Sequence, residues 1–527
     1  MPLSRRAALK SVVPLIGGAT SLATMAAMAA DAAEKPRYGG HLRIGFTLEP
    51  TGLDPHTGKS GGDLYYWRGM FDQLVDFNLS GKPDPAVSLA SAWETSDSPP
   101  SITFTLRQGV QFHDGTPFNA EAVKKNIERV QDPASKSIAR TNLAAIKSVE
   151  VLGEHKLRFN LAGPWGAGLG LLPGGGGAMN SPTALAKLGL DYAWAPIGTG
   201  PFKLKEVVTG SHVRYVRNEN YWRKDKAGNR LPYLDEVTIR IIKDETVLAS
   251  ALRAGEIDIA YVPYKEVDSF LADKNFTMTK LEGSGTNALL VMNPDLAPMN
   301  DINLRRAVCH AVNAADINKA AAFGRAVVAD AGLWPVNHTY HKRSSFRADY
   351  DLAKARAALA AGGKPNGFEL AAVTWNNPIL TKTAEIIRAQ LGRVGIKLNI
   401  ETLTVGTATD RAFATRSTPM FLTSWSMSVE PDINASANYK SGGFYNASKQ
   451  VNGGLDQQIA DAAAAYDIDK RKAMYHRIND TVLAQGLWHP MLYGVTYAAA
   501  NNKVRNAGTF IHADGRFNYK ELWLRAA

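Results

Sequence analysis

Residues 102–129 place a strand, a turn and a helix in direct succession, and this is the strongest constraint that the sequence puts on the fold. Apolar and polar residues alternate over residues 102–106, as in a strand with one buried face. Residues 113–117, His-Asp-Gly-Thr-Pro, predict a turn, because Asp and Gly tolerate tight backbone geometry and Pro fixes φ. Asn119 predicts a helix N-cap, while Ala122 leaves its capping box half complete. The segment therefore predicts that strands and helices alternate along this chain.

The second half of the chain repeats this combination of elements. Apolar residues spaced over positions 304–315 predict one helix with a single buried face, capped by Asp301. A second stripe covers residues 384–394, and the alternation over residues 396–400 predicts the strand that follows it. Residues 455–484 are helical in pattern, with one interruption. These elements predict an α/β fold, and 527 residues are too many for a single hydrophobic core.

The first 32 residues have the composition of an export signal. Residues 4–10, Ser-Arg-Arg-Ala-Ala-Leu-Lys, precede a mildly apolar run over residues 12–30. The paired arginines resemble a twin-arginine signal, and cleavage is expected after Ala29 or Ala32, because each completes a triplet of small residues. Gly and Thr residues dilute the run, which argues against a membrane anchor. Since no Cys lies in or near it, we expect a soluble periplasmic protein without a lipid anchor.

The positive charge of the chain does not indicate nucleic acid as a partner. The formal net charge is +11, yet no block of five or six basic residues appears. Lys and Arg are scattered among Asp and Glu, which predicts a solvated surface. Cys309 is the single Cys and lies off the predicted stripe of its helix. It can form no internal disulfide, and no neighbouring Cys suggests redox chemistry.

Two patterns that could indicate catalysis or metal binding lack the context that those functions need. Residues 58–62 fit G-x-S-x-G, but residues 53–57 before them are a loop, where a nucleophile elbow requires a strand. His338 and His341 stand three apart in another loop, and no companion ligand motif lies near them. We therefore expect both His residues to be polar surface residues. The sequence predicts no enzyme, no metal site and no cofactor.

Several short motifs of the sequence resemble the motifs of one family, and they occur in the same order and at the same spacing. Besides Phe-His-Asp-Gly-Thr-Pro-Phe within residues 112–118, they include Gly-Gly-His-Leu-Arg-Ile-Gly at 39–45, Leu-Asp-Pro at 53–55, Phe-Asp-Gln-Leu-Val-Asp at 71–76 and Ile-Gly-Thr-Gly-Pro-Phe at 197–202. They resemble the family 5 extracytoplasmic solute-binding proteins, which are the peptide- and nickel-type receptors of bacterial ABC importers. The family usually has Asp at the position of Ala122.

The resemblance implies a two-lobed periplasmic-binding-protein fold of type II, cluster C-like, with an extra subdomain inserted in the first lobe. The expected boundaries are a signal peptide at 1–32, lobe I at 33–75, 194–284 and 494–527, the inserted subdomain at 76–193, and lobe II at 285–493. It also implies a monomer that captures a small solute. The expected partners are an ABC permease and its ATPase at the cytoplasmic membrane.

Residues 421–432 resemble the segment with which the family holds its ligand. In its peptide receptors an acidic residue three positions after the Trp pairs with the α-ammonium of the ligand; after Trp425 this chain has Ser428. A hydroxyl cannot neutralise a buried ammonium, so either Glu430 or Asp432 takes this role or the ligand presents no free amine there. We favour the second alternative slightly. It makes amino-acid conjugates, opines, sugars and metal chelates competitors of ordinary peptides.

Other residues with aromatic or polar side chains complete the expected cleft. Tyr65, Tyr66 and Trp67 are adjacent, so they cannot all face one core, and at least one is expected to be half exposed. Trp375 and Asn377 follow a predicted strand, where α/β sheets present ligand groups. The full set of expected ligand-binding residues is Trp425, Ser428, Glu430, Asp432, Met427, Trp375, Asn377, Tyr65, Tyr66, Trp67 and Glu49.

Two other classes of protein stay open beside the solute receptor for import. The first is an exported enzyme that depends on a cofactor, since twin-arginine export carries folded proteins. It would need a nucleophile, metal or cofactor constellation, and the sequence contains no recognisable one. The second is a binding protein that senses its ligand and does not import it.

Overall fold

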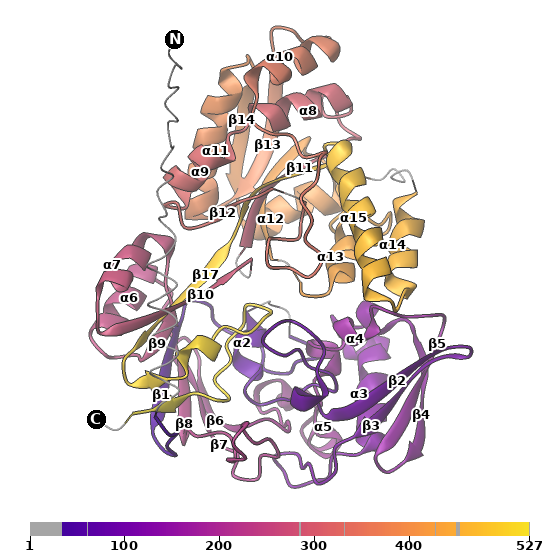
Figure 1. Ribbon diagram of the computed structural model, residues 1–527, viewed down its shortest axis with the longest axis vertical. Helices are drawn as coiled ribbons and strands as arrows, with labels where there is room; N and C mark the ends of the chain where they lie inside the picture. Colours follow the sequence, from indigo (N-terminus) through magenta and orange to yellow (C-terminus); the bar gives the residue numbers. More distant parts are fainter. Residues whose placement is uncertain are drawn as a thin grey trace, which may run out of the picture.

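The computed structural model describes residues 34–58, 60, 62–283, 286–330, 332–426, 428–448 and 454–525. They form two α/β lobes and a smaller antiparallel subdomain. In Figure 1 lobe II is the upper body, lobe I lies at the lower left and the subdomain lies beside it at the lower right. The predicted export signal at residues 1–32 lies outside the described residues.

Lobe I is built on a seven-stranded sheet in the order β10-β17-β9-β1-β8-β7-β6. β1 lies near the centre and runs parallel to β8 and β9, with Ile44 opposite both Ile239 and Ile259. Both faces of this sheet are covered, by α2 and the C-terminal segment on one side and by α6 and α7 on the other. The elements are β1 (His41–Phe46), β6 (Phe202–Val208), β7 (His212–Arg217), β8 (Glu236–Ile241), β9 (Ile259–Tyr261), β10 (Phe276–Glu282), β17 (Val495–Asn501), α2 (Asp63–Trp67), α6 (Glu245–Arg253) and α7 (Val267–Ala272).

The subdomain is a four-stranded antiparallel sheet in the order β2-β3-β5-β4 with helix α3 across it. The alternating residues of β3 have one buried set, which packs against the apolar stripe of α3. Its elements are β2 (Ala90–Asp97), β3 (Pro100–Leu106), β4 (Ile146–Gly153), β5 (Lys156–Leu161), α3 (Ala120–Gln131), α4 (Gly168–Leu171) and α5 (Pro182–Leu188).

Lobe II is built on a six-stranded sheet in the order β12-β16-β11-β15-β13-β14. β11 contributes alternate residues to two different cores, so both faces of the sheet are buried under helices. The strands are β11 (Thr286–Met292), β12 (Val327–Val328), β13 (Glu369–Trp375), β14 (Lys397–Leu403), β15 (Met420–Ser426) and β16 (Trp488–Tyr493). The helices are α8 (Ile302–Ala311), α9 (Ala314–Ala321), α10 (Leu352–Ala361), α11 (Pro378–Gly392), α12 (Val405–Thr409), α13 (Pro431–Asn438), α14 (Leu455–Ala464) and α15 (Ile468–Ala484).

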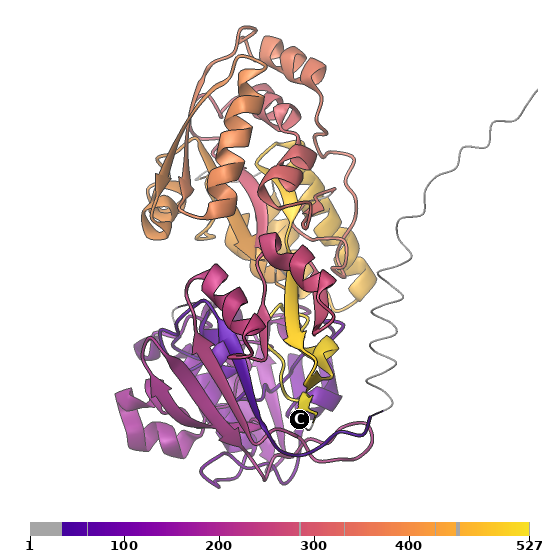
Figure 2. The ribbon, with the colours of Figure 1, turned by 90° about the vertical axis from the view of Figure 1, so that its left-hand side faces the viewer.

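The chain crosses between the lobes twice, from β10 to β11 and from β16 to β17. The two crossings lie together, because the amide of Gly283 donates to the carbonyl of Gly494 at 2.9 Å. After the second crossing the chain ends in lobe I, where β18 (Val504–Arg505) pairs with β19 (Trp523–Leu524). Figure 2 shows the C-terminal segment in yellow running down from lobe II into lobe I, with the C-terminus at the foot of lobe I. Two adjacent crossing segments of this kind are the geometry of a hinge.

The local predictions for helix starts are confirmed. Asn119 accepts a hydrogen bond from the amide of Ala122 at 3.0 Å and begins α3. Asp301 caps α8 in the same way, and Asp467 separates α14 from α15 where the helical pattern is interrupted. These side chains satisfy backbone amides that have no partner in the first turn of a helix.

Two predictions about the segment 304–315 were wrong. It is not one helix: α8 ends at Ala311, and Asn313 caps a second helix, α9, by accepting from two of its first amides. Cys309 does not lie outside the buried surface, because α8 packs in a core that also includes α10 and buries more than one stripe of it. Burial raises the pKa of the Cys309 thiol to about 12.

The lobes also touch at a point far from the hinge. The segment before α4 donates two backbone hydrogen bonds to the end of α14, from Gly166 to Ala464 at 3.1 Å and from Ala167 to Ala463 at 2.9 Å. A Cβ atom at Gly166 would overlap the carbonyl of Ala465. The approach therefore depends on the missing side chain, and we name this contact the α4–α14 contact.

We predict that Gly166→Ala moves the lobes apart, since the added methyl group overlaps backbone and not a side chain that could turn away. Small-angle X-ray scattering of the ligand-free protein should give a larger radius of gyration than for the wild type. Gly163→Ala is the matched control, because nothing lies within 4 Å of a Cβ atom there. Identical scattering of the Gly166→Ala variant and the wild type would show that this contact does not hold the lobes together.

Candidate ligand-binding site between the lobes

The carboxyl ends of the parallel strands in the two lobes face each other. In lobe II, β11 starts from the crossing at Thr286 and pairs antiparallel with β15, opposite Ser426, so the end of β15 lies on the side of lobe I. β13 runs parallel to β15 and ends at Trp375 on the same side. In lobe I, β9 ends at Tyr261 beside the start of β17, next to the other crossing. Ligands of α/β proteins bind at such strand ends.

The edge of lobe I presents a cluster of aromatic rings around Tyr65. The Tyr65 ring lies 4.4 Å from Phe46, 4.8 Å from Phe517 and 6.1 Å from Tyr261, measured between ring centroids. Tyr65 is half-buried, while its neighbours Tyr66 and Trp67 are 0% and 1% exposed. The expectation that at least one of three adjacent aromatics is half exposed is confirmed, and that residue is Tyr65.

The other expected residues of lobe I are held by interactions within the lobe. The Tyr66 hydroxyl donates to the carbonyl of Leu48, and Trp67 packs in the core of lobe I. Glu49 accepts from the amide of Gly210 at 2.7 Å and pairs with Lys243 at 3.0 Å. These contacts fix the loop after β1 against the rest of the sheet.

The edge of lobe II presents a second aromatic cluster, centred on Trp425. The half-buried Trp425 ring lies 4.4 Å from Tyr445 and 6.1 Å from Phe413, in edge-to-face arrangements. Phe444 follows in the same cluster, 4.8 Å from Tyr445, and is 59% exposed. Trp375 at the end of β13 is half-buried against Phe421. This edge therefore offers apolar ring surface that the lobe itself does not cover.

Ser428 lies directly after the end of β15 and is fixed through its backbone. Its amide donates to Asn434 Oδ1 at 2.8 Å, and its carbonyl lies 3.0 Å from His338 Nε2. No hydrogen bond of its hydroxyl to another described residue is recorded. Met427, the remaining expected residue of this segment, lies outside the described residues.

Glu430 is committed to an ion pair inside lobe II. Its carboxylate binds Arg471 with both oxygens, at 2.6 and 3.3 Å, and both side chains are 5% exposed. It also caps α13 by accepting from the amide of Asp432. Burial opposes the charge of Arg471, but the carboxylate outweighs it and raises the pKa of the guanidinium further above its usual range. Removing one partner of such a pair leaves an unpaired buried charge.

Asp432 and Asn377 also have partners within lobe II. Asp432 Oδ1 accepts from the hydroxyls of Ser436 at 3.1 Å and Tyr475 at 3.2 Å, and burial raises the pKa of this carboxyl. Asn377 caps α11 by accepting from the amides of Ile379 and Leu380. Trp375, Trp425 and Ser428 are therefore the expected residues of lobe II that are half-buried and whose side chains are not committed to a cap or an ion pair, and Tyr65 is the half-buried aromatic of lobe I.

The sequence did not point to several residues of these two edges. Phe444 and Tyr445 lie in a Gly- and Ser-rich stretch without strand or helix periodicity, and Arg516 lies in a loop near the C-terminus. A Gly-Arg-Phe triplet between turn residues was the available signal for Arg516. Only the return of the C-terminal segment to lobe I places that loop beside Tyr65.

The remaining motifs have structural partners. Asp63 accepts from Thr51 and from the amide of Ser60, so the loop that fits G-x-S-x-G is bound to the start of α2 and follows no strand. The expectation of a free surface position was wrong for His338, whose ring is half-buried between Trp334 and Tyr340. Among the described residues, no group of three or more His, Cys, Asp and Glu side chains could hold a metal ion.

Comparison with known proteins agrees with this geometry, which is that of a two-lobed binding protein. The sequence profile of the bacterial extracellular solute-binding proteins, family 5 Middle, matches residues 84–447. The glutathione-binding protein GsiB of Salmonella typhi is 28% identical over 493 residues, which cover 91% of this chain and 92% of that protein. The chain belongs to the family 5 extracellular solute-binding proteins.

Solved structures confirm the two-lobed α/β fold. The periplasmic binding protein DppA of Helicobacter pylori, in complex with the peptide STSA, superposes with a TM-score of 0.77 at 24% identity, covering 93% of this chain and 99% of that one. NikA of Brucella suis, in complex with Fe(III)-EDTA, gives a TM-score of 0.81 at 24% identity, covering 92% and 100%. In the part of the chain that the structure describes, no helix is long and apolar enough to span a membrane.

We predict that His338 makes the stability of the protein depend on pH. Its Nε2 faces the Ser428 carbonyl and its Nδ1 accepts from the amide of Tyr340 at 3.2 Å, so both ring nitrogens are used in the neutral form. Burial lowers the pKa of His338 to about 4. At His338 the unfolded chain binds a proton below about pH 6.5, whereas the folded chain binds it only near pH 4. The contribution of neutral His338 to the free energy of unfolding is therefore fully present above about pH 6.5. It is lost as the pH falls towards 4, by up to about 3 kcal/mol.

The measurement is the free energy of unfolding in urea at pH 7 and pH 4.5 for the wild type and His338→Gln. The variant should lose less stability on acidification, because Gln does not titrate. His212→Gln, on the β6–β7 hairpin, is the control and should keep the wild-type difference. An unchanged difference in His338→Gln would contradict this assignment.

Proposed function

We propose that this chain captures a small solute, a peptide or a peptide-like amino-acid conjugate, between its lobes and delivers it to an ABC importer. The observation that carries the proposal is the pair of half-exposed aromatic clusters, around Tyr65 and Trp425, on strand ends that face each other. Binding sites for small molecules combine such apolar surface with few polar groups. The relative GsiB, named as glutathione-binding, supports a peptide-like ligand.

In this proposal the lobes close around the solute by rotation at the two crossings beside Gly283 and Gly494. Contacts from both edges exist together only in the closed state, so the solute shifts the population towards it. The permease recognises the closed form, and its ATPase supplies the energy. The chain itself makes or breaks no bond and needs no cofactor, which separates the proposal from an exported enzyme.

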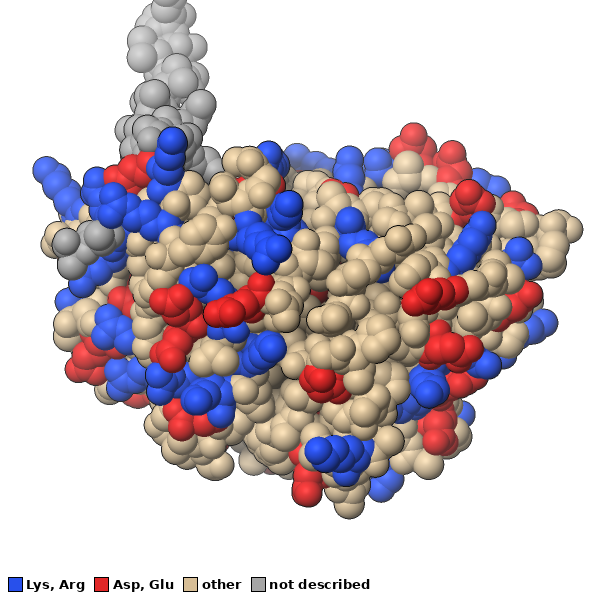
Figure 3. Space-filling view, turned by 90° about the horizontal axis from the view of Figure 1, so that it is seen from below, with Lys and Arg blue, Asp and Glu red and all other residues tan. Residues whose placement is uncertain are grey.

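The proposal also includes the cellular setting. The protein is exported to the periplasm, with residues 4–10 as a twin-arginine signal, and works there as a soluble monomer without a lipid anchor. Nucleic acid is not a partner. Figure 3 supports this for one face, where Lys and Arg are interspersed with Asp and Glu over a mostly uncharged surface.

A non-peptide solute is the second candidate, and Ser428 is the observation that favours it. The structure leaves no carboxylate of the segment after Trp425 without a partner, because Glu430 binds Arg471 and Asp432 accepts from Tyr475. An opine, a sugar or a metal chelate needs no acidic anchor for an α-ammonium. NikA, crystallised with Fe(III)-EDTA, is a neighbour in fold that holds a chelate.

The first experiment compares native and denaturing mass spectra of the protein purified from its own host compartment. A small molecule that is bound in the native spectrum and released on denaturation is the expected result. If none is found, a thermal-shift panel of peptides, opines, sugars and nickel chelates follows. Failure of every compound to raise the melting temperature would contradict the proposed function.

We predict that Trp425→Ala weakens binding of the captured solute by roughly 30-fold or more, since central aromatic contacts commonly contribute 2 kcal/mol or more. Isothermal titration calorimetry gives the affinity, and circular dichroism checks the fold. Trp194→Ala is the control, because Trp194 is 46% exposed, lies on the short helix after α5 and belongs to neither aromatic cluster. Equal affinity of the wild type and Trp425→Ala would remove Trp425 from the site.

We also predict that Ser428→Asp gives the chain affinity for ordinary dipeptides with a free α-ammonium. The new carboxylate would supply the charge-assisted partner that the wild type lacks at this position. Dipeptide titrations with the wild type and Ser428→Asp measure the gain, and Ser428→Asn is the uncharged control of similar size. Equal dipeptide affinity in all three proteins would show that the charge at this position does not select the ligand.

A further inference from the structure

Arg516 is a half-buried arginine whose hydrogen-bonding capacity is mostly unused. Its Nη1 lies 3.4 Å from the Tyr65 hydroxyl, a long contact, and its guanidinium lies over the Tyr65 ring, 5.0 Å from the centroid. Its Nε is buried and has no hydrogen-bond partner. Since a guanidinium carries five N–H donors, most of them are free. A desolvated charged donor that makes no hydrogen bond costs free energy, so a partner from outside the chain is expected.

The buried arginines Arg471 and Arg68 show what a structural role looks like. Arg471 donates to both oxygens of Glu430, to the Tyr340 hydroxyl at 2.9 Å and to the carbonyl of Ala462 at 3.0 Å. Arg68 binds carboxylates on both of its terminal nitrogens, each at 3.0 Å. Arg516 differs from both, because no carboxylate of the described residues lies within ion-pair distance of it.

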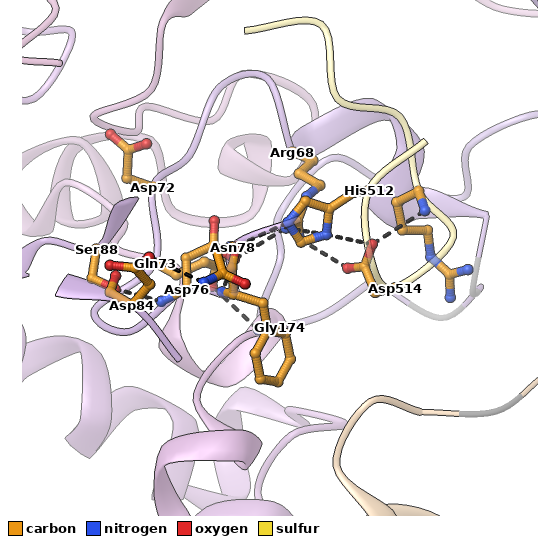
Figure 4. Close-up of polar contacts among 12 residues, drawn as sticks. Arg68, Asp72, Gln73, Asp76, Asn78, Asp84, Ser88, Gly174, His512 and Asp514 are labelled. Atoms are coloured by element: carbon orange, nitrogen blue, oxygen red, sulfur yellow. Dashed lines mark hydrogen bonds and ion pairs between the residues drawn. The ribbon is translucent and has the colours of Figure 1, made fainter. Parts of the chain in front are cut away.

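The loop that carries Arg516 is rigidly held at the edge of lobe I. The Gly515 carbonyl accepts from the hydroxyls of Tyr261 at 2.8 Å and Tyr65 at 3.3 Å. Asp514 accepts from the amide of Arg516, and Arg68, Asp76, His512 and Asp514 form a buried network next to it (Figure 4). A loop fixed from two sides presents its side chain in a defined position, which lowers the entropy cost of binding.

The same loop lies close to the ligand segment of lobe II. A Cβ atom at Gly81 would stand 3.1 Å from Val429 Cγ1 and 3.7 Å from Ala513 Cβ, so the turn at Gly81 is the spacer between the two segments. Val429 is the neighbour of Ser428, and Ala513 is three residues before Arg516. The loop that carries Arg516 in lobe I and the segment that carries Ser428 in lobe II therefore approach each other across the turn at Gly81.

The charges around this space favour an anion. Asp514 is shared between Arg68 and His512, Glu430 is paired with Arg471, and Asp432 is bound by hydroxyl groups. Burial opposes the charge of Arg516, but Tyr65 and Asp514 outweigh it and raise the pKa of the guanidinium. Arg516 therefore stays cationic, whereas Ser428 in the neighbouring segment of lobe II is neutral.

We propose that Arg516 is the anion anchor of the site between the lobes, and that the solute it selects carries a carboxylate. The planar guanidinium matches a carboxylate with two parallel N–H donors, and the Tyr65 ring beneath it supports the part of the solute next to that carboxylate. This inference rests on the proposed function. It specifies the charge that the solute must carry and the residue that binds this charge.

The test uses the full exported chain as wild type, Arg516→Met and Arg516→Lys. The matched control for binding is Arg240→Met near the end of β8, and the reference for a structural role is Arg68→Met. The probe is the small-molecule filtrate of the producing cells with added glutathione. It is applied untreated and after methylation of its carboxylates, and bound compounds are identified by mass spectrometry. Affinities for the captured compound follow by calorimetry, and melting temperatures are taken without ligand.

We expect wild type and Arg240→Met to retain a carboxylate-bearing compound from the untreated filtrate. Neither should retain the methyl ester of that compound from the methylated filtrate. Arg516→Met should bind it about 100-fold more weakly or not at all, and Arg516→Lys should fall between, since Lys offers a point charge without the planar fork. The ligand-free Arg516→Met protein should melt at or above the wild-type temperature, because the substitution removes a half-buried charge that no carboxylate pairs. Arg68→Met, which breaks a satisfied pair, should melt lower.

Three outcomes would overturn the inference or its basis, and they differ from one another. Equal affinity of Arg516→Met and wild type, or retention of the methylated compound by wild type, overturns the anion anchor and leaves the solute receptor intact. A melting temperature of Arg516→Met as low as that of Arg68→Met assigns Arg516 a structural role. A wild-type protein that retains no compound from either filtrate contradicts the proposed function itself.

Discussion

A buried guanidinium, that of Arg68, joins the end of the chain to its beginning. It follows α2 and binds Asp76 in the next loop and Asp514 in the C-terminal segment, each at 3.0 Å. Burial opposes the charge of the Asp514 carboxylate, but Arg68 and His512 outweigh it and hold its pKa far below the usual range. Since the chain leaves lobe I at β10 and returns at β17, this network is what fixes the returning loop against α2. The Tyr65 edge of the site exists only when that loop is in place.

The two lobes meet through contacts of very different kinds. The crossings at Gly283 and Gly494 are single segments joined by one backbone hydrogen bond, and Gly494 also donates to Asn287 of lobe II. The α4–α14 contact is a backbone approach that only Gly166 permits. Both leave the aromatic edges free of each other. A solute that contacts both edges adds its contacts to the closed state alone, so its binding favours closure.

Much of the fold could be predicted from local pattern, because its elements follow short-range physics. Asn119 and Asp301 cap helices where the sequence places them, and the alternation over residues 102–106 gives a strand with one buried face. The segment 304–315 shows the limit of this method. An Asn within an apolar stripe caps a new helix, and the burial of Cys309 depends on α10, about fifty residues further along the chain. Neither is encoded in the period of the stripe.

The sequence by itself determined the α/β class, the family and the neutral residue at Ser428, since these depend on residue identity and order. The tertiary structure decided which of the candidate residues are already bound to partners within the chain. The local sequence around Glu430 does not show whether this carboxylate binds a ligand or a residue of the chain, because its partner Arg471 lies forty-one residues later. Arg516 becomes a candidate for ligand binding only because the fold places it beside Tyr65, which lies 451 positions earlier in the sequence. Charge pairing is a matter of distance in space, and in this chain the return from lobe II to lobe I sets that distance.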